Sequence, residues 1–253
     1  MSVAAAQSST QSSYARIPAA FRLQFAVPSS LVWVPLMVFA GAWAIATGIA
    51  AWLTFQTEAT FTAAEPFYAG ASQAAMWCLL FMAAYTASHT FPFSMALSYS
   101  RRVFVIGAFL AFAVVSAAYG IAFMFGIWVE RITDGFGMHA YTFDLPFLVQ
   151  GEGGILGAGL LAAVVNLMLM MIGFFWSILY RRVSVPMLWT IILVLAVVTL
   201  AGATLINQAD GWGSIWEWFS RQTTLSLAGW TALWTAILAV LNYVVIRKAV
   251  PTP

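Results

Sequence analysis

The order of apolar and polar positions divides this chain into long apolar runs separated by short polar segments. About 20 helical residues cross the roughly 30 Å hydrocarbon core of a bilayer. Continuous rather than alternating apolarity favours helices over strands, and helices satisfy their own backbone in lipid. Six runs reach this length, near residues 31–55, 73–95, 103–128, 155–179, 187–206 and 224–246. The pattern predicts an all-α integral membrane protein with six transmembrane helices.

A shorter amphipathic segment precedes the first of these runs. Within "YARIPAAFRLQFAVP" at 14–28, Ile17, Phe21 and Phe25 share one helical face with Tyr14. Arginines nearby are suited to anionic headgroups, so a short N-terminal helix on the membrane surface is expected. Two roles are open for it, a topology anchor and a coupling element.

The length of the chain suits a single domain, residues 14–253, and the Ser-rich stretch 1–13 is predicted to be a disordered tail. The first apolar run is too long for the core of a signal peptide, so we interpret it as a retained transmembrane helix.

A second amphipathic segment lies between the fifth and sixth runs, in "GWGSIWEWFSR" at 211–221. Trp212, Ile215, Trp216 and Phe219 recur at helical spacing and form one apolar face. Ser214 and Glu217 have the spacing of a capping box at the start of this helix. The pattern predicts an outer-face interfacial or re-entrant helix. It is either an aromatic belt that anchors two helices or a gate over an exit path.

An Asp-Gly-aromatic-Gly phrase occurs twice, in "RITDGFG" at 131–137 and in "NQADGWG" at 207–213, each after a long apolar run. Gly adopts backbone conformations that end a helix, and Asp favours turns. The recurrence has two open explanations, helix termination alone or a duplicated hairpin. The second is suggested by "SRRVFV" at 100–105 and "YRRVSV" at 180–185, which begin two helices in the same way.

Composition supports the membrane assignment, because 63% of the 253 residues are hydrophobic and only 7% are charged. Soluble domains carry roughly a quarter charged residues. With six spans, one side of the bilayer receives no acidic residue and eight basic ones: Arg16, Arg22, Arg101, Arg102, Arg181, Arg182, Arg247 and Lys248. Basic residues collect in cytoplasmic loops, so both termini are predicted to be cytoplasmic.

The residues that support catalysis or nucleotide binding are missing from the sequence. The only lysine is Lys248, so no phosphate-binding loop is present, and no GxSxG nucleophile motif occurs. His89 and His139 lack the neighbours of a metal site, and Cys78 stands alone. We therefore expect no enzyme, no cofactor or metal in this chain, and no nucleic-acid partner.

Polar residues inside the predicted spans are few. No charge falls in the middle of a span, which argues against a pump driven by buried ionisable groups. Asn166 is near the middle of the fourth span, where it either packs against a neighbouring helix or lines a path. Gly153 and Gly157, in "GEGGILGAG", have the spacing that permits close helix approach. Pro92 is expected to bend the second helix or to interrupt its hydrogen bonding.

The turn between the second and third spans, "FPFSMALSYSRRVFVIG" at 91–107, carries a resemblance to a known family. Bacterial permease subunits of type-2 ATP-binding-cassette transporters have a similar phrase, Gly-x-Ser/Thr-Arg-Arg-x-Phe, before their third helix. Ser100, Arg101, Arg102 and Phe104 match this phrase, whereas Ser98 stands where Gly is usual. The phrase "WVERITDGFG" at 128–137 also resembles a feature of permeases in this group.

The resemblance implies a function. Residues 14–27, 94–104 and 207–223 would be the amphipathic helix, the coupling turn and the re-entrant segment of such a permease. The long outer loop at about 129–153 departs from the family pattern. Partners implied by the resemblance are a separate ATPase that binds ATP and Mg, and a second copy or a related permease, in the bacterial plasma membrane. An exporter with amphiphilic cargo is expected; the alternative is a non-transporting scaffold or sensor subunit of a larger complex.

Overall fold

The computed structural model describes residues 13–56, 61–151 and 153–247 of the chain. Its α-helices are α1 (Ile17–Gln24), α2 (Val34–Gln56), α3 (Ala74–Tyr85), α4 (Phe91–Ala96), α5 (Arg101–Ile132), α6 (Pro146–Val149), α7 (Gly154–Arg182), α8 (Val185–Gln208), α9 (Trp212–Ser220) and α10 (Thr224–Arg247). Short 3-10 or π-helical turns are η1 (Ser13–Arg16), η2 (Ser29–Trp33), η3 (Gly70–Gln73), η4 (Thr86–Thr90) and η5 (Gly135–His139). Two strands, β1 (Phe67–Tyr68) and β2 (Ala140–Tyr141), pair in parallel. Most of the predicted tail, residues 1–12, lies outside the described residues.

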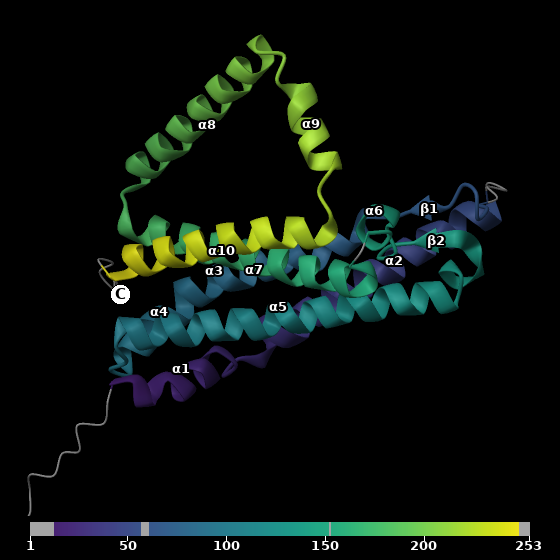
Figure 1. Ribbon diagram of the computed structural model, residues 1–253. Coiled ribbons are helices and arrows are strands. Elements are labelled where there is room, and N and C mark those ends of the chain that lie inside the picture. The colour runs from purple at the N-terminus through teal and green to yellow at the C-terminus, as the bar shows by residue number, and fades with distance from the viewer. Residues whose placement is uncertain (1–12, 57–60, 152, 248–253) are drawn as a thin grey trace, which may run out of the picture.

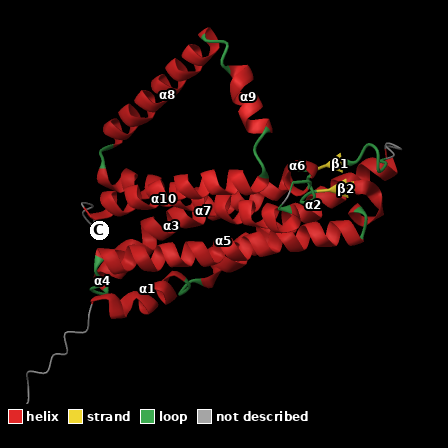
Figure 2. Cartoon of the chain, in the orientation of Figure 1, coloured by secondary structure: helices red, strands yellow, loops and turns green. Residues whose placement is uncertain are grey.

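Five helical segments among the described residues are long and apolar enough to cross a membrane: Ser29–Gln56, Arg101–Ile132, Gly154–Arg182, Val185–Gln208 and Thr224–Ile246. Each coincides with one of the predicted runs, and together they make the chain an all-α protein of the multi-pass membrane type. The described chain is almost entirely helical in Figure 2.

The remaining predicted span, 73–95, is helical but is divided into α3, η4 and α4, so no single helix of spanning length forms there. Proline explains the division. Pro92 has no N–H for the carbonyl of Ser88, four residues earlier, and the regular α-helix ends at Tyr85. The predicted interruption by Pro92 is therefore present, as a π-helical turn on its N-terminal side.

The helices form a bundle in which α5 and α7 lie side by side at the centre (Figure 1). Helices α3 and α10 pack on α7, α1 packs on α5, and α2 packs on α3. Phenylalanines dominate the largest buried side chains, among them Phe104, Phe112, Phe123 and Phe174. The core therefore lies between the two central helices and their neighbours.

Helices α8 and α9 stand away from this bundle. In Figure 1 they form two sides of a triangle whose third side is α10. No residue of α8 or of α9 is buried, although α8 is as apolar as the central helices. An apolar helix without buried side chains needs lipid or another chain as its surroundings.

The bundle has two distinct ends. The basic end holds α1, the turn 97–100 and the C-terminal ends of α7 and α10, while the strand end holds β1, β2 and α6 (Figure 1). At the strand end the parallel register sets Phe67 opposite Ala140 and Tyr68 opposite Tyr141. The described ends of the chain therefore lie at the same end of the bundle.

Small residues set the distance between the central helices. A Cβ atom at Gly120 of α5 would lie 2.6 Å from the backbone oxygen of Gly159 and 2.8 Å from the Cβ of Ala163, both on α7. At Gly173 a Cβ would meet the backbone oxygen of Leu80 on α3. In a bilayer such close backbone approach supplies much of the packing energy between helices.

This contact predicts a large difference between two glycine substitutions. We expect Gly120→Ala to lower the free energy of unfolding by about 1–3 kcal/mol, because the added methyl group overpacks the α5–α7 contact. Gly48→Ala should be neutral or stabilising, because nothing lies within 4 Å of a Cβ there and alanine favours helix. Unfolding in mixed detergent–SDS micelles measures both, and equal effects would contradict the proposed contact.

Candidate functional site

The turn at the basic end is built by a helix stop followed directly by a helix start. Ser98 has a left-handed backbone (φ 59°) after α4. Ser100 is extended, and its hydroxyl accepts a hydrogen bond from the N–H of Val103 at 3.3 Å. This N-cap begins α5 immediately, so the chain reverses within four residues.

The four residues that match the family phrase, and Ser98 in the place of its usual Gly, have different surroundings in this turn. Ser98 and Arg102 are exposed, Arg101 is half-buried and Ser100 is the cap. Phe104 is fully buried, with its ring 5.3 Å from that of Phe91 and 6.4 Å from that of Phe174. Phe104 therefore lies in the core beneath the turn, whereas Leu97, Ser98 and Arg102 are exposed on its surface.

Helix α1 lies against the first part of α5. A Cβ at Gly107 would be 2.8 Å from Ala20, and Ala20 and Gln24 are the buried residues of α1. The buried face is thus not the predicted aromatic one, since Ile17, Phe21 and Phe25 are only half-buried. Arg16 also reaches the turn, where its Nη1 donates to the backbone oxygen of Ser98 at 3.5 Å. Helix α1 and the turn are therefore in direct contact.

A further contact at the basic end involves Arg181, which sequence reasoning assigned only to topology. Its guanidinium donates to the backbone oxygen of Ser88. That oxygen is the one that Pro92 leaves without its usual helical donor. The end of α7 is thereby bonded to the π-helical turn η4. The sequence indicates that the carbonyl of Ser88 lacks a helical donor, because Pro92 follows four residues later. It does not indicate that Arg181 is the group that donates to this carbonyl.

The polar residues inside the bundle connect helices. Asn166 is fully buried on α7, and its Nδ2 donates to the hydroxyl of Ser116 on α5 at 3.2 Å. Asn242 on α10 is also buried and donates to the backbone oxygen of Met171 at 3.0 Å. Tyr119 donates to the backbone oxygen of Ser72 at 2.7 Å. These bonds favour the packing role for Asn166 over the path role.

The two glycines at the start of α7 face α10. A Cβ at Gly153 would lie 3.1 Å from the side chain of Leu225, and one at Gly157 would lie 3.7 Å from that of Thr224. The hydroxyl of Thr224 donates to the backbone oxygen of Leu148 at 2.9 Å. Gly153 and Gly157 thus lie where the start of α10 approaches α7.

The outer amphipathic segment forms the helix α9. The predicted apolar face remains outside the core, with Trp212 51%, Trp216 76% and Phe219 53% exposed and Ile215 half-buried. The ring that contacts α10 is Trp218, 6.1 Å from that of Trp230.

The predicted capping box of α9 is wrong. The helix begins one turn earlier than expected, with Gly211 as N-cap and no side-chain cap. Ser214 therefore lies inside the helix, and Glu217 pairs with Arg221 instead.

The repeated Asp-Gly-aromatic-Gly phrase ends a helix in both places. Asp134 follows α5 and Asp210 follows α8, each with a left-handed backbone (φ 49° and 48°). After α8, the N–H of Gly211 bonds the oxygen of Ile206 and that of Asp210 bonds the oxygen of Asn207. This is a Schellman motif with Asp in the position usually held by Gly. Both phrases therefore end a helix with a left-handed Asp, a geometry that helix termination and a duplicated hairpin share.

A buried carboxylate organises the strand end. Glu130, in the last turn of α5, is fully buried and accepts hydrogen bonds from the N–H groups of Thr142 at 2.9 Å, Phe143 at 2.8 Å and Asp144 at 3.0 Å. The next residue, Arg131, pairs with Asp144 through two parallel bonds of 2.8 and 3.0 Å. Two consecutive residues of α5 thus hold the segment after β2, within the long loop at about 129–153.

A tyrosine adds to this network. The hydroxyl of Tyr141 donates to Asp134 at 2.7 Å. Burial, followed by this hydrogen bond, raises the pKa of Tyr141 to about 12. The neutral phenol is therefore favoured in the folded state, and the stabilisation that it contributes is fully present below pH about 10 and is lost as the pH rises from there through about 12.

Both histidines contact polar or aromatic neighbours. The ring of His89 stacks on Tyr85 at 4.1 Å, and its Nδ1 is 2.7 Å from the hydroxyl of Ser88. His139 lies 3.2 Å from Asp134. Among the described residues, no group of three His, Cys, Asp or Glu side chains is arranged to hold a metal ion.

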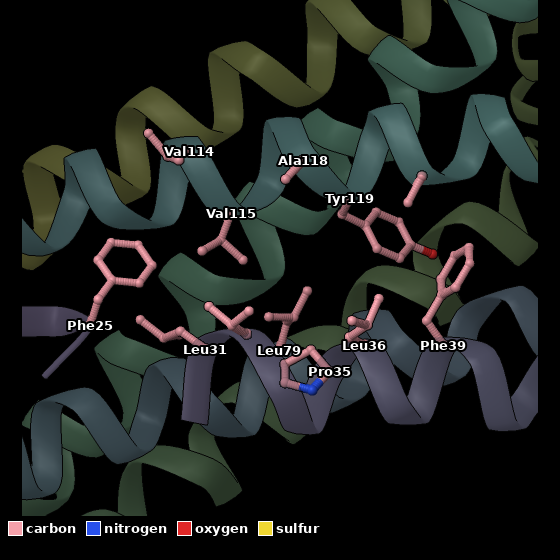
Figure 3. A pocket seen from close by; sticks show the side chains of 12 residues that line it. Phe25, Leu31, Pro35, Leu36, Phe39, Leu79, Val114, Val115, Ala118 and Tyr119 are labelled. Atoms are coloured by element: carbon pink, nitrogen blue, oxygen red, sulfur yellow. The ribbon is translucent and has the colours of Figure 1, made fainter. Parts of the chain in front are cut away.

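An apolar cavity of about 260 Å³ lies between α2, α3 and α5 (Figure 3). Leu31, Pro35 and Phe39 face Val115 and Tyr119 across it. The Tyr119 hydroxyl is already bonded to Ser72, so the cavity presents almost only carbon atoms. It therefore suits an apolar group such as an acyl chain.

No protein family, curated protein or solved structure matches this chain. Its function therefore has to be inferred from its own residues. The interior provides helix packing, the basic end provides an exposed polar turn, and the strand end provides a rigid polar loop.

The Glu130 network predicts a strong effect of one substitution. Glu130→Ala should lower the free energy of unfolding by about 3 kcal/mol, because three N–H groups lose a charged acceptor in a buried position. It should also speed proteolysis within residues 140–150. Glu130→Gln keeps one acceptor oxygen and should have a smaller effect.

The exposed Glu217 provides the control, since Glu217→Ala should change the free energy of unfolding by no more than about 0.5 kcal/mol. Detergent unfolding and limited proteolysis measure these effects. Similar results for Glu130→Ala and Glu217→Ala would show that the buried carboxylate does not hold the loop.

Proposed function

We propose that this chain is the membrane-spanning permease subunit of an ATP-binding-cassette transporter of the type-2 exporter kind. The segment α3–η4–α4 crosses the bilayer as the second of six spans. A separate ATPase subunit binds ATP and Mg and docks on the turn between α4 and α5. The single observation that supports this most is the construction of that turn, in residues that resemble the family phrase.

The construction suits the transmission of force. Arg102 and Ser98 are exposed, so a partner has access to them. Beneath them Phe104 is fully buried against Phe91 and Phe174, the latter on α7. A push on this turn therefore moves α5, and α7 with it. When the ATPase pair closes on ATP, the helices rock between inward-facing and outward-facing states.

The orientation in this proposal follows from charge. The basic end faces the cytoplasmic side of a bacterial plasma membrane. It carries the described residues Arg16, Arg22, Arg101, Arg102, Arg181 and Arg182. Glu130, Asp134 and Asp144 lie toward the strand end, on the opposite side. Lys248, Glu58 and Glu152, which belong to the same charge pattern, lie outside the described residues.

The partner within the membrane is a second copy or a related permease. Helix α8 contains no buried residue, and a cavity of about 550 Å³ lies between it and α7. Apolar side chains line that cavity, among them Trp176, Leu179 and Val194. A neighbouring permease covers this surface, and α9 lies in the outer leaflet with its exposed tryptophans at headgroup level.

The cargo in this proposal is amphiphilic or lipid-like. The cavity between α2 and α5 presents carbon atoms (Figure 3), and no charged side chain of the described residues lies in the middle of a span. Such an interior suits an acyl chain better than an ion.

One observation favours the alternative, a non-transporting scaffold or sensor subunit. Asn166 and Asn242, buried at the centre of the bundle, make hydrogen bonds to neighbouring helices, as residues with a purely structural role do. Co-purification decides between the two functions. A transporter subunit should bring down a Walker-motif ATPase and stimulate its hydrolysis, whereas a scaffold should do neither.

The orientation predicts a labelling pattern. In a Cys78→Ser background, a cysteine introduced at Ser214 should react with an impermeant thiol reagent added to intact cells, because Ser214 lies exposed on α9. A cysteine at Ser98, exposed on the turn, should react only after the membrane is opened. The reverse pattern would overturn the orientation.

The docking role of the turn predicts the effect of a double substitution. Arg101→Lys with Arg102→Lys keeps the positive charge that fixes orientation but removes the planar guanidinium, which pairs with a carboxylate through two bonds. We expect insertion to remain normal while ATPase co-purification and stimulated hydrolysis fall about tenfold, since a bidentate charged pair contributes roughly 1–3 kcal/mol.

Arg182→Lys, at an exposed arginine at the end of α7, is the matched control for this experiment and should leave ATPase binding unchanged. Full ATPase binding and hydrolysis in the Arg101/Arg102 variant, reconstituted in liposomes, would reduce that pair to a topology signal. It would also remove the main residue-level support for a coupling turn.

A further inference from the structure

A polar hollow of about 230 Å³ lies at the strand end. It is formed where β1, β2, α6 and the end of α5 meet, a region gathered at one end of the bundle in Figure 1. Its polar lining consists of Tyr68, Arg131, Tyr141, Asp144 and Gln150. These residues come from segments that are far apart in the sequence, and none of them is used by the coupling turn or by the apolar cavity.

One wall of the hollow is an ion pair held in a fixed geometry. Arg131 donates from Nε to Asp144 Oδ2 at 2.8 Å and from Nη2 to Oδ1 at 3.0 Å. The backbone N–H of Asp144 is itself bonded to the buried Glu130 at 3.0 Å. The side chains are 45% and 16% exposed, so the pair is accessible from the hollow but not dispersed in solvent. The two charges of this pair cancel, and the neighbouring carboxylates Glu130 and Asp134 leave the wall with donors and acceptors but no net positive charge.

The second wall consists of two aromatic rings. The parallel register of β1 and β2 places Tyr68 beside Tyr141, with ring centroids 6.1 Å apart and planes tilted by 34°. The hydroxyl of Tyr141 is bonded to Asp134 at 2.7 Å, which fixes that ring. Tyr68 is 43% exposed and offers both its ring and its hydroxyl.

We propose that this hollow binds a single neutral polyhydroxylated ring, that is, one monosaccharide unit. A wall without net positive charge gives no attraction to an anion, whereas a hydroxyl group both donates and accepts hydrogen bonds and so matches the mixed donors and acceptors here. Among the described residues, two of the five N–H groups of Arg131 are used by Asp144, so the guanidinium retains donors. Each Asp144 oxygen retains acceptor capacity, and the Gln150 amide supplies both functions.

Shape and surface agree with the same ligand class. The C–H faces of a sugar ring pack against aromatic rings such as those of Tyr68 and Tyr141, while its hydroxyls reach the ion pair. The hollow is smaller than the roughly 300–1,000 Å³ pockets that hold drug-sized ligands, so it accepts one ring rather than a chain of them. The ring has two possible sources, a free sugar or the headgroup of a glycolipid in the adjacent leaflet. The inference does not depend on transport.

The test uses the full chain, purified in a detergent without a sugar headgroup and placed in nanodiscs of phosphatidylglycerol and phosphatidylethanolamine. Saturation-transfer NMR is recorded with the methyl glycosides of glucose, galactose, mannose and N-acetylglucosamine. At least one should bind saturably, and Tyr68→Ala and Gln150→Ala should each weaken that binding at least about tenfold. Tyr180→Ala, an exposed tyrosine at the other end of α7, is the matched control and should leave binding unchanged.

A second arm adds a monoglycosyl diacylglycerol bearing the same sugar to the nanodiscs. Loss of methyl glycoside binding identifies a lipid headgroup as the source, and retention identifies a free sugar. The inference is overturned if none of the four glycosides binds saturably. It is also overturned if Tyr68→Ala and Gln150→Ala bind like the unsubstituted protein, or if inorganic phosphate or choline binds there more tightly than every glycoside. Because no ATPase is present, failure here leaves the proposed transporter role unaffected.

Discussion

A backbone group that is shielded from water, in hydrocarbon or in the protein interior, needs a hydrogen-bond partner from the protein itself wherever this chain leaves regular helix. The structure supplies these partners one by one. The carbonyl of Ser88, without a helical donor because of Pro92, receives the guanidinium of Arg181. The N–H groups of Thr142, Phe143 and Asp144 share the two oxygens of Glu130. The contacts that distinguish this bundle from a set of simple helices arise from this requirement.

The two ends of the bundle meet the requirement in different ways. At the basic end, the reversal between α4 and α5 takes one four-residue turn, with Ser100 as a cap and α1 packed alongside. At the strand end, a longer loop is rigid because a buried carboxylate and a bidentate ion pair hold it from beneath. An exposed turn joined to the core suits a contact that moves, and a rigid hollow suits selective binding. The proposed ATPase docking is therefore at the basic end, and the proposed monosaccharide binding is at the strand end.

Much of the helical framework was predictable because hydrophobic length alone determines it. The runs at 31–55, 103–128, 155–179, 187–206 and 224–246 all became long helices, and Pro92 indicated where the other run would be interrupted. The sequence could not show that Glu130 is buried, because its hydrogen-bond donors lie 12 to 14 residues away in a loop without periodicity. It also placed Phe104 on the turn, although the first turn of a helix directs that side chain into the core. The Tyr68–Tyr141 pair depends on two strands of two residues each, which are too short to leave a pattern.

Helix α8 has a mechanical consequence that follows from its having no buried residue. Its 24 residues rise about 36 Å, which exceeds the roughly 30 Å hydrocarbon core. A helix longer than the membrane is thick relieves the mismatch by tilting. Because none of its residues is buried against the described part of the chain, the inclination of α8 is set by its surroundings, the bilayer and the neighbouring permease of the proposed transporter. The gap between α8 and α7 therefore widens or narrows with the lipids around it, which makes this surface responsive to membrane composition.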